Sequence, residues 1–101
     1  MATTLGCHKQ SQTPEEAFKT ASPENQARWQ LAAQAASTNG YVTAVMTLRK
    51  LQTETALTQD QQAAVNTLMA KVNESLSAAE QAGDAGAKQA VEEIRRRWRF
   101  P

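Results

Sequence analysis

The residues best suited to chemistry are Cys7 and His8, the one cysteine and the one histidine among 101 residues. A thiol beside an imidazole suggests a nucleophile, a metal-binding pair or a point of covalent attachment. Two adjacent residues near one end of the chain supply neither a full zinc ligand set nor an oriented base, so the first two roles require partners elsewhere. Without such partners, Cys7 is either a point of covalent attachment or an incidental thiol in a flexible arm.

The segment Leu5-Gly6-Cys7 resembles the end of a bacterial lipobox, in which small or aliphatic residues precede a cysteine that is lipidated. The resemblance makes Cys7 the candidate lipid-attachment site, and the polar residues 8–12 fit a tether to a folded domain. A signal peptide has an apolar stretch of about 7 to 15 residues. Since residues 1–4 are too few for it, the resemblance requires a replaced signal sequence or a misplaced start codon. It implies a membrane tether in the bacterial cell envelope; otherwise we expect a cytoplasmic protein.

A second group lies at the other end of the chain, where four of the 11 basic residues stand within five positions: Arg95, Arg96, Arg97 and Arg99, followed by Phe100. Arginines beside aromatic side chains can grip phosphates, stack on bases or lie on anionic lipids. A structural role is the alternative, because Glu92 and Glu93 precede Arg96 and Arg97 by four residues and can pair with them on a helix. These arginines and Phe100 are therefore candidate partner contacts.

Overall charge and the remaining motifs argue against other functions. Eleven basic and ten acidic residues give a net charge of +1, which makes nucleic acid an unexpected partner. The pairs Glu15-Glu16 and Glu92-Glu93 point about 100° apart on a helix and suit solvated first halves of helices. No glycine-rich phosphate loop or metal-binding signature occurs. We therefore expect no catalytic residues, no metal, no cofactor and no enzymatic activity.

The elements that position these groups are predicted to be helical nearly throughout. Apolar residues make up 41% of the chain, and 19 of them are alanine, so the core should be thin and closely packed. Alanine, glutamine, glutamate, lysine, arginine and leucine dominate after residue 22, and all favour helix. We expect a flexible arm over residues 1–12 and a single α-helical domain over residues 13–101.

Capping signals divide this domain into five helices. Thr13-Pro14-Glu15-Glu16 forms a capping box that predicts a short helix over about 14–21. Ser22-Pro23 starts the second helix, which Asn39-Gly40 ends, and the third runs from Tyr41 to about residue 54. Thr58 caps a fourth helix ending at Ala82-Gly83, and Asp84 caps the last. The second helix is predicted to bury Trp29, Ala32, Ala33 and Ala36, and the fourth Val65, Leu68, Met69, Val72, Leu76 and Ala79.

The four longer helices suggest two antiparallel hairpins that are degenerate copies of each other. A displacement of 43 residues pairs Gly40 with Gly83, Ala44 with Ala87 and Leu51 with Ile94. The segments AAQAASTNGYVTAVMTL and SAAEQAGDAGAKQAV resemble the tetratricopeptide (TPR) class, which implies close helix pairs with a glycine at the tight turn. The predicted fold is all-α, with two antiparallel hairpins in a TPR-like arrangement or a four-helix bundle, preceded by a short helix.

The favoured function is a non-enzymatic helical interaction or scaffold protein, tethered to the cell envelope through Cys7, that presents a groove or face to a protein partner. The alternative is a soluble module that contacts nucleic acid or an acidic partner through the arginine-rich C-terminus. A homodimer that buries part of the stripe Leu68/Val72/Leu76 is also expected, because the core is rich in alanine and the chain is short. The sequence specifies neither the partner nor the choice between superhelix and closed bundle.

Overall fold

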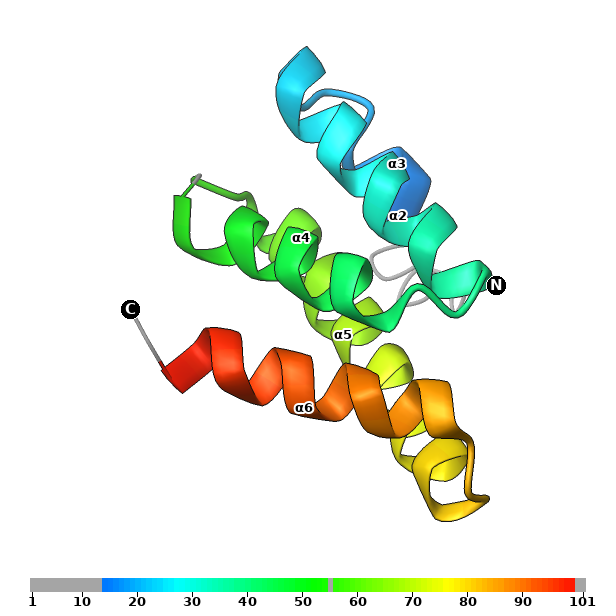
Figure 1. Ribbon diagram of the computed structural model, residues 1–101. Coiled ribbons are helices and arrows are strands. Elements are labelled where there is room, and N and C mark those ends of the chain that lie inside the picture. Colours follow the sequence, from blue (N-terminus) through cyan, green and yellow to red (C-terminus); the bar gives the residue numbers. More distant parts are fainter. Residues whose placement is uncertain (1–13, 55, 100–101) are drawn as a thin grey trace, which may run out of the picture.

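The computed structural model describes residues 14–54 and 56–99. Within these residues the regular secondary structure is entirely α-helical, which confirms the predicted class. Figure 1 shows the helices α2 (Pro14–Ala17), α3 (Pro23–Ser37), α4 (Tyr41–Glu54), α5 (Gln59–Gln81) and α6 (Ala85–Arg99). The predicted helix over 14–21 is shorter than expected, because α2 ends at Ala17 and residues 18–20 form a turn. The predicted arm over residues 1–12 lies outside the described residues.

Side-chain caps set the starts of three of the longer helices, α3, α5 and α6, as predicted. Ser22 Oγ accepts a hydrogen bond from the N–H of Asn25 at 3.2 Å, and the Asp84 carboxylate accepts one from the N–H of Gly86 at 2.9 Å. Thr58 and Gln61 form a complete capping box at the start of α5. Each bond satisfies a backbone donor that the first turn of a helix cannot satisfy itself. Thr13, the predicted cap of the first helix, lies outside the described residues.

The two turns that end α3 and α5 share one backbone geometry. Asn39 has φ 62° and Gly83 has φ 90°, and the residue after each donates its N–H back into the preceding helix. Gly40 N–H reaches Ala35 O at 2.7 Å, and Asp84 N–H reaches Ala79 O at 3.0 Å, as in a Schellman motif. The left-handed residues are thus 44 positions apart, whereas the displacement of 43 paired Gly40 with Gly83. The predicted repeat is therefore not confirmed by the turns.

Close contact between α3 and α4 explains the role of the small residues. Ala32 is fully buried, and a Cβ on Gly40 would lie 3.4 Å from the Cβ of Ala35. The buried face of α3 consists of Trp29, Ala32 and Ala35, while Ala33 and Ala36 are half-buried. The buried face thus differs from the predicted one: Ala33 and Ala36 are only half-buried, and Ala35 is buried instead because the turn at Gly40 packs directly against it.

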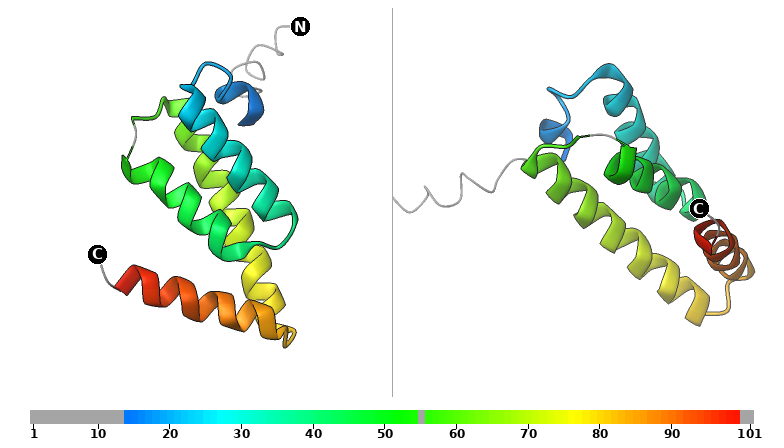
Figure 2. Two further views of the ribbon diagram at one scale, coloured as in Figure 1. Left: turned by 45° about the horizontal axis from the view of Figure 1, so that its top comes forward. Right: turned by 90° about the vertical axis from the view of Figure 1, so that its left-hand side faces the viewer.

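Helix α4 lies at the centre of the arrangement and contacts α3, α5 and α6. Its side chains Val45, Leu48 and Leu51 are fully buried and take part in the two hydrophobic clusters of the domain. Figure 2 shows that α3 and α4 fold back on each other, whereas α6 leaves α5 at a wide angle and lies beside α4. The second helix pair is therefore splayed, and α4 and α6 run in the same direction.

The short segment around α2 is held by polar contacts at both of its ends. The buried side chain of Gln61 donates a hydrogen bond from Nε2 to Ala17 O at 3.0 Å, which ties α2 to α5. The Gln26 amide donates to Lys19 O at 2.8 Å and to Ala21 O at 3.1 Å. These bonds satisfy carbonyls that a short helix leaves without partners, and they fix the segment against α3 and α5.

Candidate functional site

The first candidate surface is a basic end formed by the C-terminal parts of α4 and α6. The two helices contact each other, and both finish on the left-hand side of Figure 1. Exposed basic side chains lie in these parts: Arg49 and Lys50 about one turn before the end of α4, and Arg95, Arg96 and Arg97 close to the end of α6. Helix C-termini carry a partial negative charge that favours nearby cations. We call this set of five residues the basic end.

Ion pairs engage part of the basic end. Glu93 binds both Arg96 and Arg97, with the Arg97 Nε at 2.6 Å from Glu93 Oε2. The two arginine side chains remain 64% and 54% exposed, so water screens these pairs strongly and they contribute little to stability. Arg95 is exposed and forms no ion pair with another described residue. Of the predicted pairs, Glu93–Arg97 is present, whereas Arg96 pairs with Glu93 rather than with Glu92.

The other residues predicted for this surface are only partly described. Arg99 lies in the last turn of α6, but its side chain, like that of Trp98, is not among the described ones. Phe100 and the candidate lipid-attachment residue Cys7 lie outside the described residues. Sequence reasoning missed the contribution of Arg49 and Lys50. An adjacent basic pair near the predicted end of a helix was the available signal, but nothing in the sequence placed it at the same end of the molecule as the arginines of α6.

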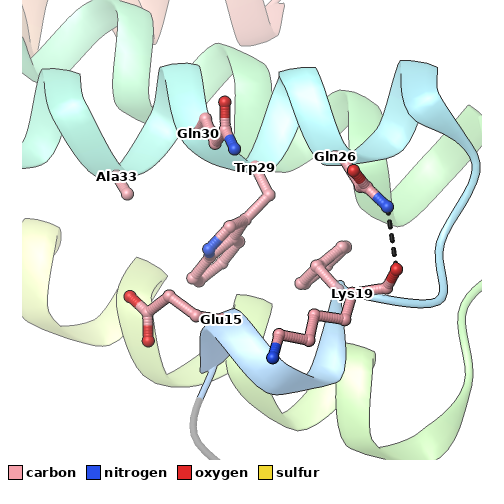
Figure 3. A pocket seen from close by; sticks show the side chains of 7 residues that line it. Glu15, Lys19, Gln26, Trp29, Gln30 and Ala33 are labelled. Carbon is pink, nitrogen blue, oxygen red and sulfur yellow. Dashed lines mark hydrogen bonds between the residues drawn. The ribbon is translucent and has the colours of Figure 1, made fainter.

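The second candidate is a pocket between the α2 segment and α3, with a volume of about 340 Å³. Its apolar lining comes from Phe18, Trp29 and Ala33, and its polar lining from Glu15, Lys19, Gln26 and Gln30. In Figure 3 Glu15 and Lys19 approach from the α2 segment, while Trp29, Gln30 and Ala33 project from α3. This volume falls at the lower end of the range for small-molecule sites.

A stacked aromatic pair forms the apolar part of this pocket. The rings of Phe18 and Trp29 are nearly parallel, with centroids 4.8 Å apart and an angle of 8° between their planes. Both side chains are buried, so their positions are fixed by the core. The pair joins the two segments on either side of the break at Ser22-Pro23. Sequence reasoning treated Trp29 as core and did not identify the pocket, because the stack depends on the turn that brings Phe18 onto α3.

The polar groups at the pocket differ in how far they are engaged. Gln26 binds the backbone of the α2 segment, and this is the hydrogen bond drawn in Figure 3 among the lining residues. Glu15, Lys19 and Gln30 are exposed, and no ion pair joins Glu15 to Lys19 within the part of the chain that the structure describes. Opposite charges therefore stand at the pocket without neutralising each other directly.

The stripe expected to form a dimer is largely used within the chain. Val72 and Leu76 are 3% and 6% exposed, because they pack against α4 and α6 in the second hydrophobic cluster. Leu68 is half-buried and contacts both clusters. A dimer would therefore need a different surface.

Comparisons with known proteins do not add a relative: the chain matches no family model, no curated protein and no solved structure. Over the described residues, none of the helices combines the length and apolar character needed to cross a bilayer. The same residues contain no cluster of three or more histidine, cysteine, aspartate or glutamate side chains with the geometry of a metal site.

Proposed function

We propose that this protein is a non-enzymatic helical interaction protein whose basic end binds an acidic segment of a partner protein. The observation that carries the proposal is that α4 and α6 contact each other and run in the same direction, which brings Arg49 and Lys50 to the same end of the molecule as Arg95, Arg96 and Arg97. The helical domain acts as the scaffold that holds this surface in place, with α4 packed against α3, α5 and α6.

The distribution of charge supports an acidic partner. Six of the 11 basic residues but only three of the ten acidic ones belong to positions 49–54 and 92–99. The remainder of the chain holds five basic and seven acidic residues, so the protein is polarised although its net charge is +1. Such a local field steers an oppositely charged surface toward one end of the molecule. A protein partner is favoured over nucleic acid, because the net charge of +1 gives no overall field that attracts a polyanion as large as DNA.

The test uses a short poly-glutamate peptide and a DNA duplex as defined ligands. Lys50→Glu/Arg95→Glu reverses two exposed charges of the basic end, and Lys71→Glu/Lys88→Glu reverses two exposed charges elsewhere on α5 and α6. We expect the first double variant to weaken peptide binding at least about tenfold and the second to change it little. Equal losses in both variants, or no binding of the peptide by the unaltered protein, would contradict the proposal. Tighter binding of DNA, with a steep linear fall of log affinity against log salt, would favour the nucleic-acid alternative.

We further propose that Cys7 tethers this scaffold to a membrane of the bacterial cell envelope. Its support is the resemblance of Leu5-Gly6-Cys7 to a lipobox. The test is the intact mass and the membrane partitioning of the protein expressed from its complete native reading frame. A lipid-sized mass increase and membrane association, both lost in Cys7→Ser, are the expected results. An unmodified product that stays in the aqueous fraction would refute the tether and leave the basic end as the basis of the function.

A further inference from the structure

The turn between α3 and α4 contains the sequence Asn39-Gly40, in which a side-chain amide precedes a residue without a Cβ. The backbone nitrogen that follows an asparagine can attack the carbonyl of the asparagine side chain, and glycine leaves this approach open because it has no side chain. The other three asparagines, Asn25, Asn66 and Asn73, lie within helices and precede larger residues. Asn39 is exposed and lies between two helices, so it is the asparagine best placed for this reaction.

We propose that Asn39 is the site of spontaneous deamidation in this protein and that the folded turn controls the rate of the reaction. The backbone nitrogen of Gly40 forms a bond to Asn39 Cγ, the bond from Cγ to Nδ2 breaks, and the side-chain nitrogen leaves as ammonia with the proton of the Gly40 N–H. Water then opens the resulting cyclic imide at either carbonyl, which gives aspartate or isoaspartate at position 39. The overall change exchanges an amide for a carboxylic acid, with one water consumed and one ammonia released.

The folded turn opposes this attack, because the attacking nitrogen is already engaged. The N–H of Gly40 donates to Ala35 O at 2.7 Å, a short hydrogen bond that holds the proton that the reaction must remove. Asn39 is fixed in the left-handed region with φ 62°, and Gly40 is half-buried against Ala35. Attack therefore requires a local opening of the turn that breaks this hydrogen bond. The rate of deamidation thus depends on how often the junction between α3 and α4 opens.

Either product weakens the turn that joins α3 to α4. Aspartate places a negative charge directly after Thr38, the C-cap of α3, where the helix end already carries a partial negative charge. Isoaspartate adds a carbon atom to the backbone, and the close approach of Gly40 to Ala35, where an added Cβ would lie only 3.4 Å from the Ala35 Cβ, leaves little room for it. We expect both products to unfold at a lower urea concentration than the unmodified protein, with the isoaspartate form unfolding at the lowest.

The test incubates the full chain in mildly alkaline buffer, with and without guanidinium chloride, and follows its tryptic peptides by mass spectrometry. Cleavage after lysine and arginine places each of the four asparagines on a different peptide, so the modified residue is identified directly. We expect the peptide of residues 29–49 to gain the mass of the amide-to-acid exchange first, and at least about tenfold faster in the denaturant than in the folded protein. Earlier modification of another asparagine would refute the site, and equal rates in both solutions would refute control by the folded turn.

Three variants separate the chemistry from the structure. Asn39→Gly removes the amide but supplies a residue that readily adopts φ 62°, so the fold should persist and the peptide should stay unmodified. Gly40→Ala keeps the amide and adds a Cβ beside the attacking nitrogen, so deamidation of the denatured chain should slow at least about tenfold. An unchanged rate in Gly40→Ala would exclude attack by the backbone nitrogen. Asn39→Asp reproduces one product, and a urea midpoint no lower than that of the unaltered protein would contradict the expected weakening of the turn.

Discussion

Gln61 provides the sharpest test of how the short α2 segment is held in place. Its side chain is 4% exposed and makes two hydrogen bonds to backbone groups. Oε1 accepts from the N–H of Thr58 at 3.0 Å, which completes the capping box, and Nε2 donates to Ala17 O, also at 3.0 Å. The first bond is local, whereas the second joins residues 44 positions apart. Gln61→Met keeps the size of the side chain and removes both bonds.

The expected loss follows from the burial of the two backbone groups. The carbonyl of Ala17 is buried with its partner, so leaving it unsatisfied costs about 1–3 kcal/mol. The N–H of Thr58 is only part-buried, and water replaces some of its lost bond, so its share is about 1 kcal/mol. The gain from burying the apolar methionine offsets part of this sum. We therefore expect Gln61→Met to lower the free energy of unfolding by roughly 1–3 kcal/mol, out of about 5–15 for a domain of this size.

Urea unfolding followed by circular dichroism measures this loss. With a slope of about 1.5 kcal/mol per molar urea, the midpoint should fall by about 0.7–2 M. The control is Gln62→Met, an exposed neighbour on the same turn, which should change stability by less than about 0.5 kcal/mol. A fall no larger than that of the control would refute the assigned role of Gln61.

A second variant separates the two bonds. Gln61→Glu retains an oxygen for the N–H of Thr58 but has no donor for Ala17 O and places a carboxylate beside that carbonyl. We expect it to be at least as unstable as Gln61→Met, because the tertiary bond is the larger contribution. Stability close to that of the unaltered protein would show that the capping box alone explains the burial of Gln61.

Three further predictions concern the turns, the core and a cap. Gly83→Ala should lower the free energy of unfolding by about 1–2 kcal/mol, because φ is 90° at this residue. Gly86→Ala should raise it by about 0.5 kcal/mol, since the added Cβ would lie 3.4 Å from the Asp84 carboxylate and alanine favours helix. Thermal unfolding that gives both changes the same sign would contradict this prediction. Leu48→Ala should lower the free energy of unfolding, measured in urea, by about 2–5 kcal/mol, because Leu48 is fully buried. Leu31→Ala, at a site that is 50% exposed, should change it by less than about 0.5 kcal/mol. Similar losses in both variants would place Leu48 outside the core. Asp84→Ala should cost about 0.5–2 kcal/mol and reduce amide protection at Gly86 in hydrogen exchange; unchanged protection would exclude the cap.

Helix ends were the most predictable part of this protein, because they depend on interactions within a few residues. Ser22, Thr58 and Asp84 cap the helices that their positions in the sequence indicated. The one clear difference is α2, where the helix gives way at Ala17. The carbonyl of Ala17 accepts a hydrogen bond from the side chain of Gln61, and the carbonyl of Lys19 in the following turn accepts one from Gln26. Both of these side chains belong to later helices. Local signals cannot report partners so far away in the chain.

The buried face of each helix was predictable to within about one residue along the chain. The stripe on α5 is buried or half-buried as expected, but on α3 Ala35 takes a place assigned to Ala33 and Ala36. Helical spacing identifies which side of a helix is apolar, whereas the exact register depends on what packs against it. Here the packing partner is the turn at Gly40, and its shape comes from the left-handed residue Asn39.

By itself the sequence determined the all-α class, the order of the helices and their caps, since these follow from propensity and from contacts within one turn. Only the tertiary structure decided that α6 splays from α5 and lies beside α4, that Gln61 ties down α2, and that Phe18 stacks on Trp29 to form a pocket. An amphipathic stripe predicts that one face of a helix is buried, but it does not specify which other helix packs against that face. The choice among partners depends on how small residues such as Ala32 and Ala35 let backbones approach, a property of surfaces in contact rather than of any one segment.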